Sequence, residues 1–144
     1  NNLLPYIAQV AVGKRAALKV FGDDYKTRDG TGERDYIHVM DLANAHVAAI
    51  NALHTHTGHQ AINVGTGKGA TVLEMVAAFE RASGVAIPTQ KVARRKGDIA
   101  SGYAQVDLAR TRLKWRAEFG ISDICKGTWD WQSRNPDGFQ GRET

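Results

Sequence analysis

The sequence predicts a small α/β unit in which helices and short strands alternate along one chain. Leu3, Ile7 and Val10 recur at the spacing of one helix face, and Gly13 stops that run. The mostly apolar stretch 18–21 has the length and composition of a short strand. Interleaved helical and strand patterns of this kind are typical of mixed layers rather than of a helix bundle or a β-sandwich.

The next elements follow in chain order. Residues 23–33 are polar and contain glycines, which predicts a loop, and residues 36–39 then form a strand candidate. Asp41 has the chemistry of a helix cap and is expected to open a helix over 42–53. The run 61–64 is mostly apolar and predicts a further strand.

The second half of the chain adds three helices. Thr71 and Glu74 have the spacing of a capping box, and the helix that they open is expected to end at Gly84. A short helix is predicted over 107–113, with its first residue, an aspartate, as the cap. The last predicted helix spans 122–133.

Composition excludes several classes of protein. The chain has 144 residues, of which 42% are hydrophobic and 24% charged, as in one globular domain. Its formal charge of +4 is spread along the chain, so it permits an anionic ligand without demanding nucleic acid. No apolar run approaches the roughly 20 residues that span a bilayer. The single cysteine, Cys125, and the lack of a signal-like start predict a cytoplasmic protein, and the start at Asn1 without Met is interpreted as a cut end.

Two patterns resemble ligand-binding motifs but are interpreted as structural or exposed segments. Residues 65–69 follow a predicted strand and precede a helix, as phosphate-binding loops do, but their spacing is G-x-G-x-G. A tight turn that lines a neighbouring pocket is favoured over a dinucleotide site. His54, His56 and His59 cluster without a carboxylate or a cysteine at ligand spacing, so we expect exposed loop residues and no metal site.

Arginines and aromatic rings are better candidates for ligand binding. Arg34 adjoins a predicted strand, and Arg95 precedes a glycine turn. Two guanidinium forks from separate loops would suit a diphosphate, although charge alone favours solvated surface arginines. Phe21, Tyr36 and Tyr103 carry rings that could stack on a nucleotide base, and core packing is the alternative for each ring.

One long run, DGTGERDYIHVMDLA at 29–43, carries a specific signature, and shorter runs at 1–13, 63–67, 94–98 and 129–139 accompany it. These runs resemble the UDP-galactose (UDP-glucose) 4-epimerases of the extended short-chain dehydrogenase/reductase superfamily. The resemblance covers nearly the whole chain. It implies that 1–144 is the UDP-sugar-binding C-terminal part of such an enzyme, a small mixed α/β domain without the N-terminal Rossmann domain.

The resemblance also implies one UDP-sugar site. In the family, the uracil lies beside the strand at 19–21, two arginines bind the diphosphate, and an acidic side chain accepts hydrogen bonds from the ribose. Arg34 and Arg95 correspond to the two arginines, and Asp98 corresponds to the acid. Gly102 stands where the family often has a tyrosine that contacts the ligand. The implied ligand residues are Asn2, Leu3, Lys19, Val20, Phe21, Arg34, Tyr36, Val72, Arg95 and Asp98.

The family's catalytic pair has no counterpart in the sequence. None of the four tyrosines is followed by a lysine four positions later, as the family's Tyr-x-x-x-Lys pair requires; they are Tyr6, Tyr25, Tyr36 and Tyr103. The resemblance implies that NAD binds to the missing Rossmann domain, that no cofactor binds to this chain, and that the isolated chain is inactive. It further implies UDP-glucose and UDP-galactose as ligands, no nucleic acid or membrane partner, and a homodimeric parent enzyme.

Two alternatives stay open on the sequence. The first is a stand-alone UDP-sugar-binding module without catalysis, for which UDP binding would be measurable in the chain by itself. The second, from charge alone, is a basic nucleic-acid-binding domain, for which binding would weaken steeply as salt is added.

Overall fold

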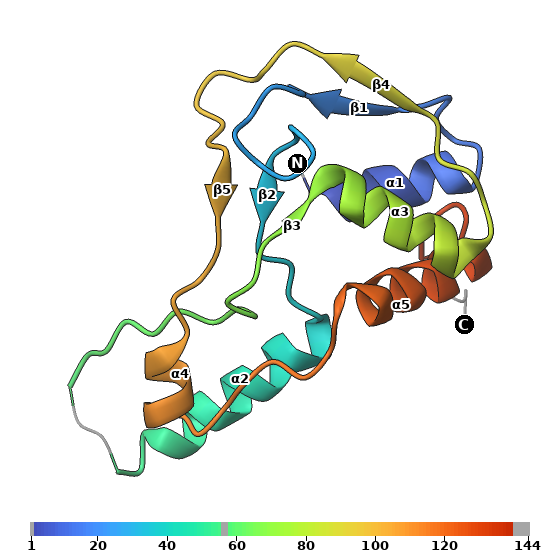
Figure 1. Cartoon of the computed structure of the whole chain (residues 1–144). Helices are drawn as coiled ribbons and strands as arrows, with labels where there is room; N and C mark the ends of the chain where they lie inside the picture. The colour runs from blue at the N-terminus through green and yellow to red at the C-terminus, as the bar shows by residue number, and fades with distance from the viewer. Residues whose placement is uncertain (1, 56–57, 140–144) are drawn as a thin grey trace.

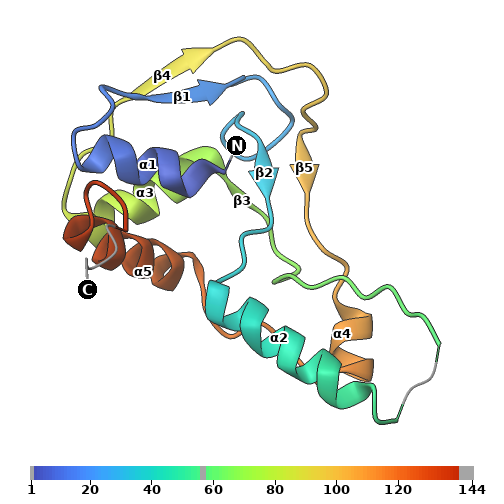
Figure 2. The same ribbon diagram turned by 180° about the vertical axis from the view of Figure 1, so that it is seen from behind.

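The computed structural model describes residues 2–55 and 58–139. It contains helices and strands in alternation, as Figures 1 and 2 show from opposite sides. The helices are α1 (Leu3–Ala11), α2 (Val39–Ala52), α3 (Val72–Ser83), α4 (Asp107–Arg112) and α5 (Ile121–Arg134). The strands are β1 (Leu18–Phe21), β2 (Glu33–Arg34), β3 (Ala70–Thr71), β4 (Thr89–Val92) and β5 (Ser101–Gly102).

The molecule has two packed parts. In both ribbon views the β1–β4 pair lies above α1 and α3, α5 lies beneath them, and α2 and α4 lie lowest. β1 and β4 are parallel, with Leu18 opposite Thr89. The second sheet has the order β3-β2-β5, and its middle strand runs antiparallel to β3 and parallel to β5. Segments that are remote in sequence therefore meet on both sides of β2.

The larger core lies where α1, α3 and α5 pack together under β1. Ile7, Met75, Phe79 and Cys125 have no exposed surface there. Trp129 adds its ring from α5, edge-on to Phe79 with the ring centroids 6.2 Å apart. This packing explains why the apolar periodicity of α1 and α3 is so clear in the sequence, since each helix buries a single face.

The smaller core joins α2 to α4. Its buried members are Ala45, Ala109 and Trp115. Asp41 is 2% exposed and accepts hydrogen bonds from the backbone amides of Glu118 and Phe119, at 3.0 to 3.1 Å. The carboxylate thereby ties the first turn of α2 to the segment that leads into α5.

Several sequence predictions are confirmed. Helix α1, strand β1 and helix α5 lie where the patterns placed them, within a residue at each end. Thr71 and Glu74 form a capping box at the start of α3, and Gly84 ends the helix in the left-handed region with φ 70°. These elements are indicated by local sequence, either by a periodic apolar face or by specific cap residues, so their prediction does not depend on distant contacts.

The prediction of a strand at 36–39 and a cap at Asp41 is wrong. The strand is β2, at Glu33–Arg34, and α2 begins at Val39. His38 is the cap, because its Nδ1 accepts a hydrogen bond from the Met40 amide at 3.1 Å. Tyr36 packs against the larger core and Ile37 against the smaller one, and these tertiary contacts override the β-propensity of the run.

The predicted strand at 61–64 is also wrong, because none of its residues belongs to a strand of the described structure. Ile62 and Val64 are apolar because they pack against the smaller core. Strands β3, β4 and β5 were missed by the sequence patterns, since two-residue strands show no periodicity and β4 is mostly exposed. Asp107 is the first residue of α4, which ends at Arg112.

Within residues 2–55 and 58–139, no helix is both long enough and apolar enough to cross a membrane. The same residues contain no group of three or more metal-ligating side chains. His54 and His59 are exposed, as expected, and His56 lies outside the described residues.

Candidate functional site

A cavity of about 490 Å³ opens between the start of α1, strand β1 and the segment that links β4 to β5. Every residue that the resemblance assigned to UDP-sugar binding lines this cavity. They come from five separate stretches of the chain, which the fold brings together: Asn2, Leu3, Lys19, Val20, Phe21, Arg34, Tyr36, Val72, Arg95 and Asp98.

Other residues line the same cavity and were not singled out in the sequence. Tyr6 follows Leu3 by one helical turn, so the period of α1 could have identified it. Arg15 and Tyr25 lie in connecting segments whose course the sequence pattern does not predict. The remaining members are Ala17, Leu18, Gly32 and Ile99.

Strand β1 forms one wall of the cavity by simple alternation. Leu18 and Val20 are buried in the core, whereas Lys19 and Phe21 are exposed. Successive side chains of a strand point to opposite faces, so burying one pair presents the other on the outer face. Phe21 is 36% exposed, so part of this aromatic residue stays accessible at the cavity wall.

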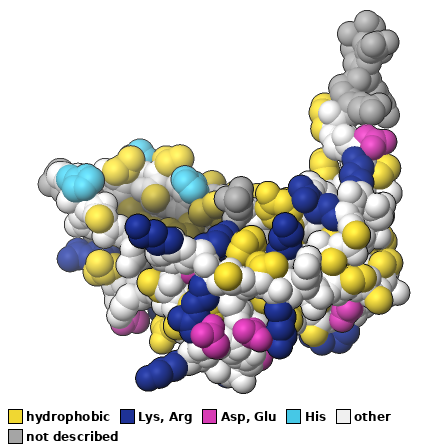
Figure 3. Space-filling view, turned by 90° about the horizontal axis from the view of Figure 1, so that it is seen from above, with side chains coloured by type: hydrophobic (Ala, Val, Ile, Leu, Met, Phe, Trp, Pro, Cys, Tyr) yellow, Lys and Arg dark blue, Asp and Glu magenta, His cyan; other side chains and the backbone are white. Residues whose placement is uncertain are grey.

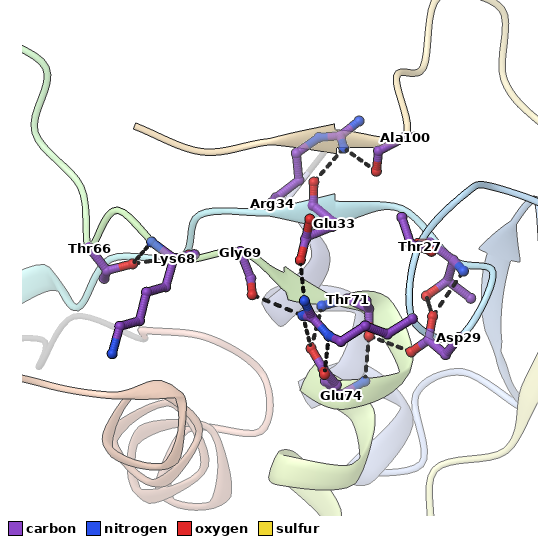
Figure 4. Close-up of polar contacts among 12 residues, drawn as sticks. Thr27, Asp29, Glu33, Arg34, Thr66, Lys68, Gly69, Thr71, Glu74 and Ala100 are labelled. Carbon is purple, nitrogen blue, oxygen red and sulfur yellow. Dashed lines mark hydrogen bonds and ion pairs between the residues drawn. The ribbon is translucent and has the colours of Figure 1, made fainter. Parts of the chain in front are cut away.

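Arg34 enters the cavity from β2. Its Nη1 donates a hydrogen bond to the Glu33 carbonyl at 2.7 Å and a longer one to the Ala100 carbonyl at 3.5 Å (Figure 4). Both acceptors are neutral, and both involve the same nitrogen. Within the described structure the guanidinium therefore keeps Nε and Nη2 for other acceptors, and no carboxylate forms an ion pair with it.

Arg95 reaches the same cavity from the segment between β4 and β5. Its Nε donates to Asp98 Oδ2 at 2.8 Å, and its guanidinium carbon lies 4.7 Å from the centroid of the Phe21 ring. The turn that joins Arg95 to Asp98 contains Gly97 at φ 88°, in the left-handed region that glycine adopts without strain. The neighbouring Arg94 points elsewhere, onto the Tyr25 ring at 4.0 Å, and pairs with Asp24.

Two tyrosines of the cavity wall differ in their surroundings. Burial raises the pKa of the Tyr36 hydroxyl above its ordinary value, although the charge of Arg34 pulls the same pKa down. The hydroxyl therefore stays protonated near neutral pH and can donate. The Tyr25 hydroxyl is buried and is the one buried side-chain oxygen or nitrogen of the described residues without a hydrogen-bond partner.

A polar network joins β2 and β3 to the first turn of α3 (Figure 4). Arg28 bonds Glu74 twice, at 2.7 and 2.8 Å, and reaches Glu33 at 2.7 Å and the Gly69 carbonyl at 3.0 Å. The hydrogen bonds from Arg28 lower the pKa of Glu74 to about 2. The network fixes the strand that carries Arg34, because Glu33 precedes that arginine directly.

The glycine loop 65–69 does not offer a phosphate site. The Asp35 carboxylate accepts from the amides of Thr66 and Gly67 at 3.0 Å and from the Thr66 hydroxyl at 2.6 Å. The amides of Thr66 and Gly67 are thus already occupied by an internal anion. A Cβ on Gly69 would lie 2.4 Å from a Glu33 side-chain carbon, so this glycine permits close packing. The loop is the tight turn that its spacing favours, and it lines a second cavity of about 910 Å³.

Figure 3 shows basic, acidic and hydrophobic side chains interspersed on the face seen from above, without one continuous basic stripe on that face. Burial raises the pKa of the Cys125 thiol to about 11, which keeps it protonated and unreactive near neutral pH.

The fold is that of the C-terminal portion of an epimerase of the extended short-chain dehydrogenase/reductase family, as sequence relatives and solved structures show. The chain belongs to the family whose sequence model is described as GDP-mannose 4,6 dehydratase, and that model matches residues 1–128. It is 55% identical to the UDP-glucose 4-epimerase of Mus musculus over 139 residues, which are 96% of this chain and 40% of the relative. The enzyme of the same name from Erwinia amylovora is 55% identical over 138 residues, covering 96% of this chain and 41% of the relative.

Solved structures agree with these relatives. A UDP-glucose 4-epimerase from Stenotrophomonas maltophila, with bound NAD and formylated UDP-arabinopyranose, superimposes with a TM-score of 0.92 at 49% identity, over 94% of this chain and 40% of that one. The Bifidobacterium longum UDP-glucose 4-epimerase, in complex with NAD+ and UDP, gives a TM-score of 0.90 at 50% identity, over 96% of this chain and 41% of that one.

These comparisons confirm the resemblance to UDP-glucose 4-epimerases and the predicted class, a small mixed α/β unit that matches the C-terminal portion of those enzymes. The chain spans about 40% of the length of the curated relatives that it matches. The convergence of the site residues is observed in the structure, while the ligand that they hold stays a prediction.

Proposed function

We propose that this chain forms the C-terminal, UDP-sugar-binding portion of a UDP-glucose 4-epimerase, an isomerase of galactose metabolism that interconverts UDP-galactose and UDP-glucose. The convergence of Arg34 and Arg95 on one cavity, beside Phe21 and Asp98, carries the proposal. Its volume of about 490 Å³ falls in the range of ligand sites, which is roughly 300–1,000 Å³.

Each part of the nucleotide has a chemically suitable neighbour in this arrangement. Two guanidinium forks can bond several oxygens of a diphosphate, and a fork fits phosphate geometry better than a single ammonium. The Asp98 carboxylate can accept hydrogen bonds from ribose hydroxyls. The Phe21 ring offers a face for the base. The remaining predicted residues, such as Asn2 and Leu3, close the cavity around the ligand.

The chain's own residues do not fit NAD. Asp35 bonds the Thr66 and Gly67 amides of the glycine loop, and the described chain has no Tyr-x-x-x-Lys pair. We therefore assign NAD binding and hydride transfer to an N-terminal Rossmann domain of a longer protein, with no step of that chemistry on these residues. We expect the longer protein to be a homodimer in the cytoplasm, where a single buried cysteine stays reduced.

Exposed apolar residues on the outer face of α2 favour the presence of a partner domain. Val39 and Leu53 are each 70% exposed, and between them Val47 and Ile50 are 56% and 60% exposed. A contiguous apolar surface of this kind usually marks an interface. We infer that the missing part of the protein packs there, since the relatives extend well beyond the length of this chain.

Calorimetric titration with UDP tests the binding half of the proposal. We expect weak but saturable binding by the isolated chain, because part of a pocket buries only part of the ligand. Heat that is indistinguishable from dilution at millimolar UDP would contradict it.

Mixing the chain with a separately produced Rossmann half tests the enzymatic half. Restored interconversion of UDP-galactose and UDP-glucose is expected from the mixture. A stand-alone binding module would instead bind UDP with full affinity by itself and gain no activity from the added half.

A further inference from the structure

The two residues proposed for the diphosphate and the ribose are bonded to each other in this structure. Arg95 Nε lies 2.8 Å from Asp98 Oδ2, and the guanidinium lies 4.7 Å above the Phe21 ring. The backbone reinforces the pair, since the Asp98 amide donates to the Arg95 carbonyl at 3.2 Å. All three side chains line the cavity. Arg95 therefore covers the aromatic surface and neutralises the acid at the same time.

Arg34 and Arg95, two of the arginines that line the cavity, differ in what holds them. Arg34 is held by neutral carbonyls, so an incoming anion meets its full charge. Arg95 is held by a carboxylate, so an anion must compete with Asp98 and is repelled by it. A side chain that accepts hydrogen bonds only, as a carboxylate does, can be drawn away by a donor such as a ribose hydroxyl.

We propose that Asp98 is a specificity-determining residue. Its ion pair with Arg95 weakens the binding of inorganic phosphates by that arginine, and the pair opens when a nucleoside diphosphate binds. A ribosyl ligand supplies hydroxyls that bond Asp98 in place of Arg95, and its base takes the Phe21 ring that Arg95 covered. The freed guanidinium then binds the diphosphate of the same ligand. Pyrophosphate has neither a ribose hydroxyl to bond Asp98 nor a base to contact Phe21. Arg95 therefore stays paired with Asp98 when pyrophosphate enters the cavity. This inference rests on the proposed function and adds the means by which the site rejects bare anions.

The chain contains a matched control pair. Arg94 and Asp24 form an ion pair at 2.6 Å next to an aromatic ring, as Arg95 and Asp98 do, but neither residue lines the cavity. Asp24→Asn removes the same charge near the site without freeing a cavity arginine. This variant therefore distinguishes the release of Arg95 from a general change of the electrostatic potential.

The experiment measures the affinity of sodium pyrophosphate and of UDP by titration calorimetry for the unchanged chain and for Asp98→Asn, Asp24→Asn, Arg95→Gln and the double variant Arg95→Gln/Asp98→Asn. We expect Asp98→Asn to bind pyrophosphate about threefold to fivefold more tightly. This fold-change corresponds to the free energy that a partly exposed ion pair contributes. Asp24→Asn should leave pyrophosphate binding unchanged. UDP binding should not improve in Asp98→Asn, because the ribose acceptor is weakened.

The double variant decides the mechanism. If Asp98 acts by masking Arg95, the gain in pyrophosphate affinity disappears when Arg95 is already absent. The inference is overturned if Asp98→Asn gives an equal gain in pyrophosphate affinity in the Arg95→Gln background, or if Asp24→Asn gives the same gain. It is also overturned if Asp98→Asn gives no gain, or if no variant binds pyrophosphate measurably. Failure of the unchanged chain to bind UDP is a different result, which refutes the proposed function itself.

Discussion

Thr66 donates both its backbone amide and its hydroxyl to the carboxylate of Asp35, across thirty-one positions of sequence. Gly67 and Ala104 add their amides to the same carboxylate at 3.0 and 3.2 Å. One acidic side chain thus joins the end of β2, the glycine loop and the segment after β5. The strand that carries Arg34 is held in place from the residue directly after it.

Asp35→Asn should destabilise the chain by about 2 kcal/mol. The amide keeps one acceptor oxygen but loses the charge, and hydrogen bonds to charged groups contribute about 1.5–3 kcal/mol. Urea unfolding followed by circular dichroism measures the change. Thr66→Ala removes only the hydroxyl donor and should cost about 1 kcal/mol. Equal unfolding midpoints for Asp35→Asn and the unchanged chain would contradict the role given to Asp35.

Arg34→Gln should weaken UDP binding at least tenfold, by about 1.5 kcal/mol or more, because a charge-assisted bond to phosphate is lost. Calorimetric titration with UDP measures this loss. Arg94→Gln is the control, since Arg94 faces Asp24 outside the cavity. If both variants lost affinity equally, the effect would come from overall charge, and Arg34 would have no special position.

Acid should destabilise the fold in part through Glu74. Its pKa is about 2 in the folded chain, lowered first by the hydrogen bond from Arg28, against 4.5 as the ordinary value. A lowered folded pKa contributes stability above pH 4.5 that is lost as the pH falls toward 2. Because the side chain is 40% exposed, water screens the pair and the contribution is about 1 kcal/mol or less. Urea midpoints between pH 5 and 2 should therefore fall less steeply in Glu74→Gln than in the unchanged chain.

Tyr25→Phe should raise stability by about 1 kcal/mol. The Tyr25 hydroxyl is buried without a partner, so its removal relieves a desolvation cost of about 1–3 kcal/mol while the ring packing stays. Thermal unfolding should show the higher midpoint. Tyr103→Phe, at a side chain that is 61% exposed, should leave the midpoint unchanged. A lower midpoint in Tyr25→Phe would mean that the hydroxyl is satisfied in solution.

Two glycine substitutions should have opposite signs. Gly69→Ala places a Cβ 2.4 Å from the Glu33 Cγ and should cost about 1–3 kcal/mol through overpacking. Gly127→Ala lies inside α5, where the nearest atom, His38 Nε2, is 3.6 Å away, and should stabilise the helix by about 0.5–1 kcal/mol. Chemical denaturation of both variants gives the two signs directly, and a shared sign would show that the contact distances do not govern the outcome.

The parts of the fold that the sequence predicted are those with a local cause. Gly84 ends α3 through its own conformational freedom, and the alternation in β1 reflects one buried face. By contrast, β2 exists only because β3 and β5 lie on both sides of it, and two residues carry no period from which to predict it. The start of α2 was misplaced for a related reason, since a histidine cap at His38 is less common than an aspartate cap.

The candidate site was predictable where chemistry and resemblance agreed. Arg34 and Arg95 were expected to meet, and both line one cavity. Arg15 and Tyr25 were not expected there, because their side chains reach the cavity from irregular segments. The direct pairing of Arg95 with Asp98 was also outside the reach of sequence, since three-residue spacing alone does not say whether two side chains face each other.

The parallel pairing of β1 with β4 has a consequence for how the molecule is made. Leu18 lies opposite Thr89, so the pairing must close a long stretch of chain before it gains any hydrogen bond. We expect such long-range contacts to form after the helices, whose contacts are local in sequence. The wall that presents Phe21 is therefore completed only when the second strand arrives, and a change in 89–92 that never touches a ligand could slow maturation of the cavity.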